Sequence, residues 1–152
     1  MRLEDNNIVS DIRKFNRFYT KLLNLLDSHV LNTDYSFTEA RIILEIGFME
    51  QCIANNLVEK LDIDRSYMSR IIAKLGRDGV IRKKASTADS RTSLISLTPK
   101  GIDLFKQLNK KSDEQIVKLF HGLSQKEIKE VHSSMMLIQQ KLDKLGDLND
   151  TF

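Results

Sequence analysis

The chain has 152 residues, enough for a single domain to bury a hydrophobic core without disulfides or metals. Apolar residues make up 41% and charged residues 30% of the sequence, which excludes a disordered chain, while the single cysteine excludes an internal disulfide framework and fits a reducing, cytoplasmic location. The net charge of +3 is modest, no apolar run approaches the ~20 residues that a membrane span needs, and the first residues lack the apolar segment of a signal peptide.

The N-terminal part of the chain predicts two helices. Apolar residues from Ile8 to Val30 recur at steps of three and four, and their stripe is wide enough to contact more than one neighbour. After a polar break at residues 32–35, a second helix is expected to begin with a capping box. In this box Ser36 accepts from the first-turn amides and Glu39 reaches back to the cap.

A tight pair of helices is predicted next. The first covers residues 55–61, a turn follows at 62–64, and the second runs from Arg65 to about Gly76 with Asp64 as its N-cap. The apolar face of the second helix consists of Met68, Ile71, Ile72 and Leu75. Polar and basic side chains therefore lie on its other face.

A β-hairpin and two long helices complete the chain. Residues 80–84 and 92–97 predict the strands, with a polar tip between them. Thr98 and Pro99 begin a helix that extends to about Phe120, and a capping box from Ser124 to Glu127 opens the last one, whose apolar positions continue to Leu145. The terminal helices have more apolar surface than a small core can cover, so we expect them to pair with each other and with a second copy of the chain.

The paired helices predict a helix-turn-helix, whose second helix enters the major groove of DNA. We expect Arg70 to bind guanine and Lys74 to contact phosphate, although ordinary solvated side chains are the alternative for both. The other residues expected at DNA from this helix are Arg65, Ser66, Tyr67 and Ser69.

The hairpin would form a wing beside that helix. Its rising strand has the phosphate-binding candidates Arg82, Lys83 and Lys84, and Arg91 near the tip is long enough to enter a minor groove. We expect Asp89 to hold the guanidinium of Arg91 by a charge-assisted hydrogen bond, the alternative being a weak surface ion pair.

Basic residues are concentrated in this part of the chain. Between Arg65 and Arg91 there are eight basic and two acidic residues, so the segment carries +6 and the rest of the chain −3. Such a concentration favours a polyanion as the partner. Charge alone would be equally consistent with a solvated basic face.

The segment from Asp89 to Gly101, DSRTSLISLTPKG, resembles the wing signature D-x-R-x(5)-L-T-x-x-G of the MarR family. Residues 57–70 resemble the helix-turn-helix of that family and 79–83 its run into the wing, so the resemblance covers about residues 8–146. Two positions depart from the pattern. Ile53 stands where the family often has a Thr or Ser cap, and Ser90 replaces a basic residue of the wing.

The resemblance implies a mainly α fold with a small β-hairpin wing (α+β), a winged helix-turn-helix flanked by N- and C-terminal dimerisation helices. Within one unit of residues 1–152, it implies a DNA-binding lobe at 36–100 and a helical dimerisation region at 5–31 and 101–146. It further implies a homodimeric, ligand-responsive repressor on a pseudo-palindromic operator. A winged-helix protein-interaction module without DNA binding is the alternative.

An effector pocket is expected where the dimerising helices meet the DNA-binding lobe. Candidates by position are Phe15, Phe18, Tyr19, Leu22, Arg41 and Phe48, with core packing as the alternative for each. In some branches of the family, oxidation or metal replaces a small-molecule effector.

No catalytic set, phosphate-binding loop or cofactor motif is present, so we expect neither an enzyme nor a bound cofactor. The histidines at 29, 121 and 132 are too dispersed to form a metal site. Cys52 has no neighbouring His or Lys to activate its thiol, which favours core packing over a redox role.

Overall fold

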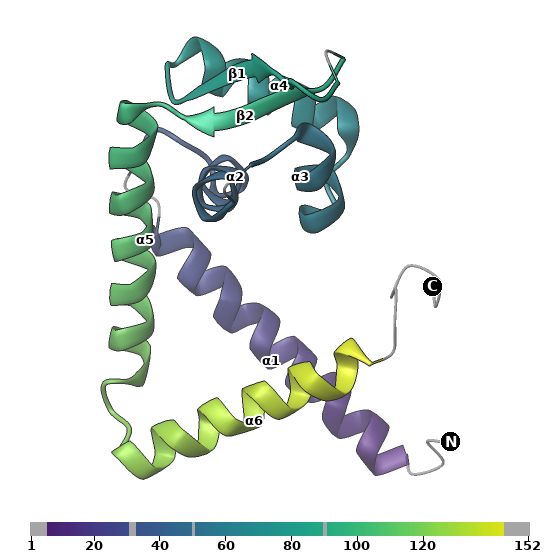
Figure 1. The fold of residues 1–152 in the computed structure, drawn as a ribbon. Helices are drawn as coiled ribbons and strands as arrows, with labels where there is room; N and C mark the ends of the chain where they lie inside the picture. The colour runs from purple at the N-terminus through teal and green to yellow at the C-terminus, as the bar shows by residue number, and fades with distance from the viewer. Residues whose placement is uncertain (1–5, 31–32, 50, 90, 145–152) are drawn as a thin grey trace. The chain divides into compact units, whose positions relative to one another are not determined.

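The computed structural model describes residues 6–30, 33–49, 51–89 and 91–144 (Figure 1). They form two compact units that divide between Asp113 and Glu114. The elements in chain order are α1 (Asn6–Val30), α2 (Phe37–Phe48), α3 (Ala54–Leu61), α4 (Arg65–Arg77), β1 (Ile81–Ala85), β2 (Ser93–Leu97), α5 (Pro99–Phe120) and α6 (Gln125–Asp143). This order confirms the predicted fold class, helices with one antiparallel hairpin. Leu145 and Ser90, which were part of the predicted last helix and wing tip, lie outside the described residues.

Side-chain caps set where three of the helices begin. The Ser36 hydroxyl accepts from the Glu39 amide at 3.2 Å, and the Asp64 carboxylate accepts from the Tyr67 amide at 3.1 Å. Ser124 and Glu127 form both halves of the predicted box at α6, and these hydrogen bonds lower the pKa of the Glu127 carboxyl. Each such cap typically stabilises a protein by about 1 kcal/mol.

The first predicted capping box is only half formed. The Glu39 side chain does not return to the cap residue, because both of its oxygens bind the Lys74 ammonium instead. At the start of α3 only the other half of a capping box is formed. The N-cap residue Ile53 has no side-chain acceptor, but its amide donates to Asn56 Oδ1 at 3.1 Å. The first cap of the helix-turn-helix therefore comes from a residue inside the helix.

The hydrophobic core lies in the first unit, where α2, α3, α4 and the hairpin meet. The predicted apolar face of α4 is buried, with Met68, Ile71, Ile72 and Leu75 all at most 4% exposed. Leu108 of α5 is fully buried in the same cluster. Figure 1 shows the hairpin lying over α2, with α4 behind the strands and α3 toward one end. The helix α4 is thus held by packing along one whole face.

Cys52 belongs to this core. Its side chain is 1% exposed, and its carbonyl accepts from the Ile95 amide at 2.7 Å, which adds a single bridge to the outer side of β2. Burial raises the pKa of the thiol, so the reactive thiolate is disfavoured. The predicted core role of Cys52 is confirmed.

The hairpin is anchored where it runs into α5. The Thr98 amide donates to the Val80 carbonyl at 3.0 Å. The Thr98 hydroxyl donates to the Gly79 carbonyl and accepts from the Gly101 amide at 3.1 Å. A Cβ atom on Gly101 would lie 2.1 Å from the Val80 carbonyl oxygen, so no larger residue fits without a shift. These contacts give the L-T-x-x-G part of the wing signature a physical reason.

The helices α1 and α6 each expose many apolar side chains to solvent. Exposed examples in α1 are Ile8, Ile12, Phe15, Phe18, Leu23 and Leu25, and in α6 they are Met136, Leu137, Ile138 and Leu142. None of the described helices is long and apolar enough to cross a membrane.

Candidate nucleic-acid interface

The outer face of α4 presents the residues expected to reach DNA bases. Ser66, Tyr67, Ser69 and Arg70 are exposed there, opposite the buried apolar face. The guanidinium carbon of Arg70 lies 5.6 Å from the centroid of the Tyr67 ring. Such a cation–π contact restricts the guanidinium to fewer orientations and leaves its N–H edge available for hydrogen bonds.

Arg65, at the first position of α4, has a partner within the protein. Its guanidinium donates to Asn55 Oδ1 at 3.0 Å, and the Asn55 amide donates in turn to Glu59 Oε1 at 3.1 Å. This chain of contacts joins the two helices of the helix-turn-helix. A DNA contact by Arg65 stays a prediction, and it would have to coexist with the bond to Asn55.

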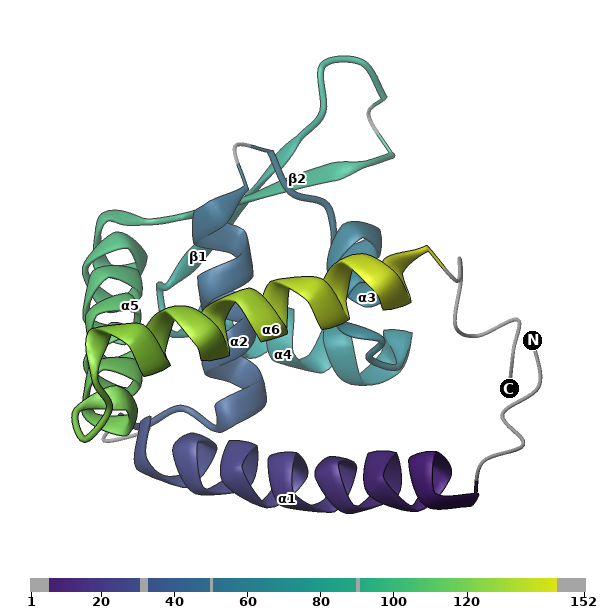
Figure 2. The ribbon, with the colours of Figure 1, turned by 90° about the horizontal axis from the view of Figure 1, so that it is seen from below.

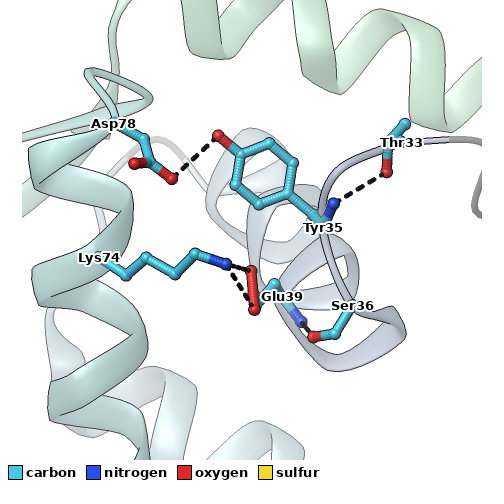
Figure 3. A network of polar contacts seen from close by, with 6 residues as sticks. All are labelled: Thr33, Tyr35, Ser36, Glu39, Lys74 and Asp78. Carbon is cyan, nitrogen blue, oxygen red and sulfur yellow. Dashed lines mark hydrogen bonds and ion pairs between the residues drawn. The ribbon is translucent and has the colours of Figure 1, made fainter.

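Lys74 is held by a carboxylate and an aromatic ring. Its ammonium donates to the two oxygens of Glu39 at 3.0 and 2.7 Å and lies 5.3 Å from the centroid of the Tyr35 ring (Figure 3). The hydrogen bond to Glu39 is the main cause that raises the pKa of Lys74. The phosphate contact expected of Lys74 stays a prediction, but the structure provides a competing partner.

Tyr35 connects the same region to the end of α4. Its hydroxyl donates to Asp78 Oδ2 at 3.2 Å (Figure 3), and burial followed by the charge of Asp78 raises the pKa of the phenol. Sequence reasoning missed this pair, because 43 residues separate its members and neither has a local motif.

The wing consists of β1, β2 and the loop between them, and its tip projects beyond the neighbouring helices (Figure 2). Arg82, Lys83 and Lys84 are all exposed, in register with Ser96, Ile95 and Leu94. Since neighbouring side chains of a strand point to opposite faces, Arg82 and Lys84 share one face and Lys83 occupies the other. The basic run is thus divided between the two faces of the hairpin.

The predicted bond between Asp89 and the guanidinium of Arg91 is not formed. Asp89 Oδ1 accepts from the backbone amide of Arg91 at 3.0 Å, and Oδ2 accepts from the Thr92 hydroxyl at 3.3 Å. Short acidic side chains cap turns in this way because two-residue spacing brings the amide within reach. The Arg91 side chain is therefore exposed and is not bound by Asp89.

Among the described residues, the open grooves along α1, α6 and α3 are lined by residues other than the effector-pocket candidates. Phe15 stacks on Tyr19 at 5.5 Å, and Phe48 meets Phe105 edge-on at 5.2 Å. Phe18 and Phe48 are 63% and 62% exposed, so core packing within the chain is the wrong explanation for these two. An open groove along α1 is lined by other residues, namely Asn16, Arg17, Thr20, Lys21, Asn24 and Leu25. Leu22 is half-buried and Arg41 exposed.

Within the described part of the chain, no three His, Cys, Asp or Glu side chains gather in a way that could hold a metal ion. His121 and His132 are exposed, whereas the side chain of His29 lies outside the described residues.

A helix-turn-helix whose second helix exposes polar and basic residues beside a basic hairpin defines the chain as a winged helix-turn-helix protein. Residues 33–92 match the sequence model of the MarR family, a segment that contains α2, α3, α4, β1 and most of the wing tip. Over this segment the chain is similar to the MarR family.

Two curated relatives are HTH-type transcriptional regulators named BilQ. The protein of Clostridium symbiosum is 28% identical over 102 residues, which cover 67% of this chain and 68% of the relative. The protein of Clostridioides difficile is 29% identical over 94 residues, covering 59% and 64%, respectively. The chain thus spans about two thirds of the length of these relatives.

Solved structures of MarR-family proteins share the fold. The transcription regulator SP03579 aligns with a TM-score of 0.76 at 17% identity, covering 93% of this chain and 94% of that structure. Streptococcus pneumoniae FabT in complex with DNA aligns with a TM-score of 0.75 at 20% identity, covering 88% and 99%. At these identities the likeness shows the fold.

Proposed function

We propose that the chain is a sequence-specific repressor that binds duplex DNA in the cytoplasm as a homodimer on a pseudo-palindromic operator. In the proposed complex α4 enters the major groove, where Arg70 binds a guanine edge and the serines contact neighbouring groups. The exposed cations of β1 bind phosphates, and Arg91 enters the adjoining minor groove.

The observation that carries this proposal is the polar, exposed face of α4 beside an exposed basic wing. Arg70 has an aromatic ring to orient it, and the Arg91 side chain is exposed with no bond to Asp89. Both guanidinium groups can therefore take DNA as a partner without breaking an ion pair to a carboxylate. Two solved neighbours, FabT and a regulator from Listeria monocytogenes with a 26mer DNA, are described as DNA complexes, which supports the same use of the fold here.

The homodimer is proposed on the apolar side chains of α1 and α6. About half of the surface of Ile8, Ile12, Phe15, Leu137 and Leu142 is exposed in a single chain. A solvated surface does not need apolar side chains at helical spacing on both terminal helices. Burial of the exposed half of each would contribute about 1 kcal/mol. We propose the regions 5–31 and 101–146 for dimerisation and 36–100 for DNA binding.

A small-molecule effector is proposed as the regulator of DNA binding. The structure of PcaV from Streptomyces coelicolor, described as a complex with its natural ligand, aligns with a TM-score of 0.63 at 17% identity and supports this expectation. The site is proposed at Phe15, Phe18, Tyr19, Leu22, Arg41 and Phe48.

The test begins with selection of duplexes from a random pool and measurement of their affinity by fluorescence anisotropy. Nanomolar binding to a selected duplex and at least a thousandfold weaker binding to unrelated DNA are expected, in the range of ~10³–10⁷ for specific regulators. Light scattering of the free protein should give the mass of two chains. The variant Lys106→Ala, which removes an exposed cation of α5 outside the proposed DNA-binding region 36–100, serves as the matched control for DNA affinity.

A winged-helix module that binds another protein is the alternative function. Absence of any shift with duplex DNA up to micromolar protein, at ~150 mM salt, would favour this alternative and sink the proposal. A monomeric mass with intact DNA binding would remove only the homodimer.

A further inference from the structure

The segment before α2 and its first turn reach across to α4 at two places. Glu39 binds the ammonium of Lys74, and Tyr35 donates to the carboxylate of Asp78 (Figure 3). The ammonium of Lys74 also lies over the ring of Tyr35, so a third contact links the first two. We call these four side chains, Tyr35, Glu39, Lys74 and Asp78, the clamp.

Lys74 has little to gain by leaving the clamp for a phosphate. Its side chain is 41% exposed but that of Glu39 is only 13% exposed. If Lys74 moved to DNA, the largely buried Glu39 side chain would lose its only ion-pair partner in the described chain, and an unpaired carboxylate in such a place is unfavourable. It would also repel the approaching phosphates.

The spacing of the two contacts gives the clamp a geometric effect. Lys74 and Asp78 are four residues apart, which is one turn or about 6 Å along a helix. A single contact would let α4 pivot about that point, whereas two contacts a turn apart resist both tilting and rotation. A small rotation of α4 displaces the tip of Arg70, which lies one turn before Lys74, by more than it displaces the axis.

From these contacts we propose that Lys74 is a positioning residue for the recognition helix, held by Glu39 and Tyr35, and that it does not serve as a phosphate anchor. This inference rests on the proposed function, because its main consequence is measured on DNA. The clamp sets the orientation of α4 in which Arg70 meets base edges. It contributes to discrimination between sequences and not to the general attraction for DNA.

The variants Glu39→Ala and Lys74→Met distinguish a positioning role of Lys74 from a role as phosphate anchor, because the two roles predict different changes in DNA affinity. If Lys74 positions α4, both variants and Tyr35→Phe should lower the ratio of operator to non-operator affinity, by roughly tenfold for the first two. The slope of log affinity against log salt should stay unchanged. If Lys74 were a phosphate anchor, Lys74→Met would reduce that slope by about 0.9, and Glu39→Ala would free a cation and tighten binding to all DNA.

A measurement without DNA keeps the clamp testable if the proposed function fails. Hydrogen exchange of the amides of Asp78, Gly79 and Val80, which close the end of α4, should become faster in all three variants but not in Lys106→Met. Unchanged exchange in the variants overturns the clamp. Absence of duplex binding by the unmodified protein overturns the proposed function alone.

If a single variant does not fold, the charge-reversed pair Glu39→Lys with Lys74→Glu replaces it. Recovery of folding and of sequence preference in the pair supports the clamp. A folded pair with sequence preference still lost overturns it, because the ionic contact would then be present without its proposed effect.

Discussion

The carboxylate of Asp89 holds the backbone of Arg91 and leaves its side chain unbound, with Oδ1 accepting from the Arg91 amide at 3.0 Å. The wing signature therefore pairs an acidic turn cap with a guanidinium that is available for DNA. A carboxylate near the tip would by itself repel DNA phosphates. The two hydrogen bonds that Asp89 accepts stabilise the turn of the wing and so offset this repulsion.

This relationship predicts different outcomes for two substitutions of Asp89. Asp89→Asn keeps an oxygen that can cap the Arg91 amide, so DNA affinity should stay equal or rise slightly as a negative charge is lost. Asp89→Ala removes the cap, so the turn is held less firmly, and DNA binding should weaken by about 0.5–1.5 kcal/mol, the usual net worth of a hydrogen bond. Anisotropy titrations at one salt concentration measure both. Equal losses in the two variants would mean that the charge, and not the cap, is what matters.

Arg70 and Arg91 should differ in how their loss affects binding. Arg70→Ala should cost about 1–3 kcal/mol on the operator and relax the preference at one base position. Arg91→Ala should weaken binding to all sequences and reduce the salt slope by about 1. Competition titrations with single-base operator variants, repeated at several salt concentrations, measure both effects. Operator affinity unchanged in both variants would contradict the assignment.

Gly47 and Gly76 offer a matched pair of helical glycines for stability. A Cβ atom on Gly47 would lie 2.2 Å from the Phe105 ring, whereas one on Gly76 would meet nothing within 4 Å. Gly47→Ala should therefore destabilise the protein by about 1–3 kcal/mol because the ring must move. Gly76→Ala should stabilise it by about 0.5–1 kcal/mol because the unfolded chain loses freedom. Urea unfolding followed by circular dichroism distinguishes the two, and effects of the same sign would contradict the packing at Gly47.

The clamp predicts a loss of stability in alkaline solution. The pKa of Tyr35 is raised by burial and by Asp78, and that of Lys74 is raised by its bond to Glu39. A group whose pKa is raised on folding contributes its full stability below its ordinary pKa, which is about 10 for both side chains, and loses it as the pH rises further. The stability difference between the unmodified protein and Tyr35→Phe should therefore shrink above about pH 10. Urea unfolding from pH 8 to pH 11 measures it, and curves that stay parallel would disprove the coupling.

Local chemistry in the sequence was sufficient to predict the elements. Caps such as Ser36 and Asp64, the periodic apolar face of α4 and the Thr98-Pro99 start of α5 act over a few residues, so their effect can be read directly from their spacing. The same holds for the burial of Cys52, which follows from an apolar neighbourhood. The family resemblance supported the wing, which the hairpin after the helix-turn-helix had already predicted.

Partners of charged side chains could not be read in this way. Asp89 was expected to bind the guanidinium of Arg91 and binds its amide, and Lys74 was expected at a phosphate but lies between Glu39 and Tyr35. A long side chain on a surface has several partners within reach, and the choice among them depends on which segments the core brings close.

The sequence by itself thus determined the order of the helices and strands, the buried face of the recognition helix and the basic character of the wing, because these depend on periodicity and on contacts within a few residues. Only the tertiary structure decided which cations are held inside the protein and which are free to meet a ligand. It also decided that the backbone of Gly101 lies so close to the Val80 carbonyl that a Cβ atom does not fit there. These features join residues far apart in the chain, and their geometry exists only after α2, α4 and the hairpin have packed around one core.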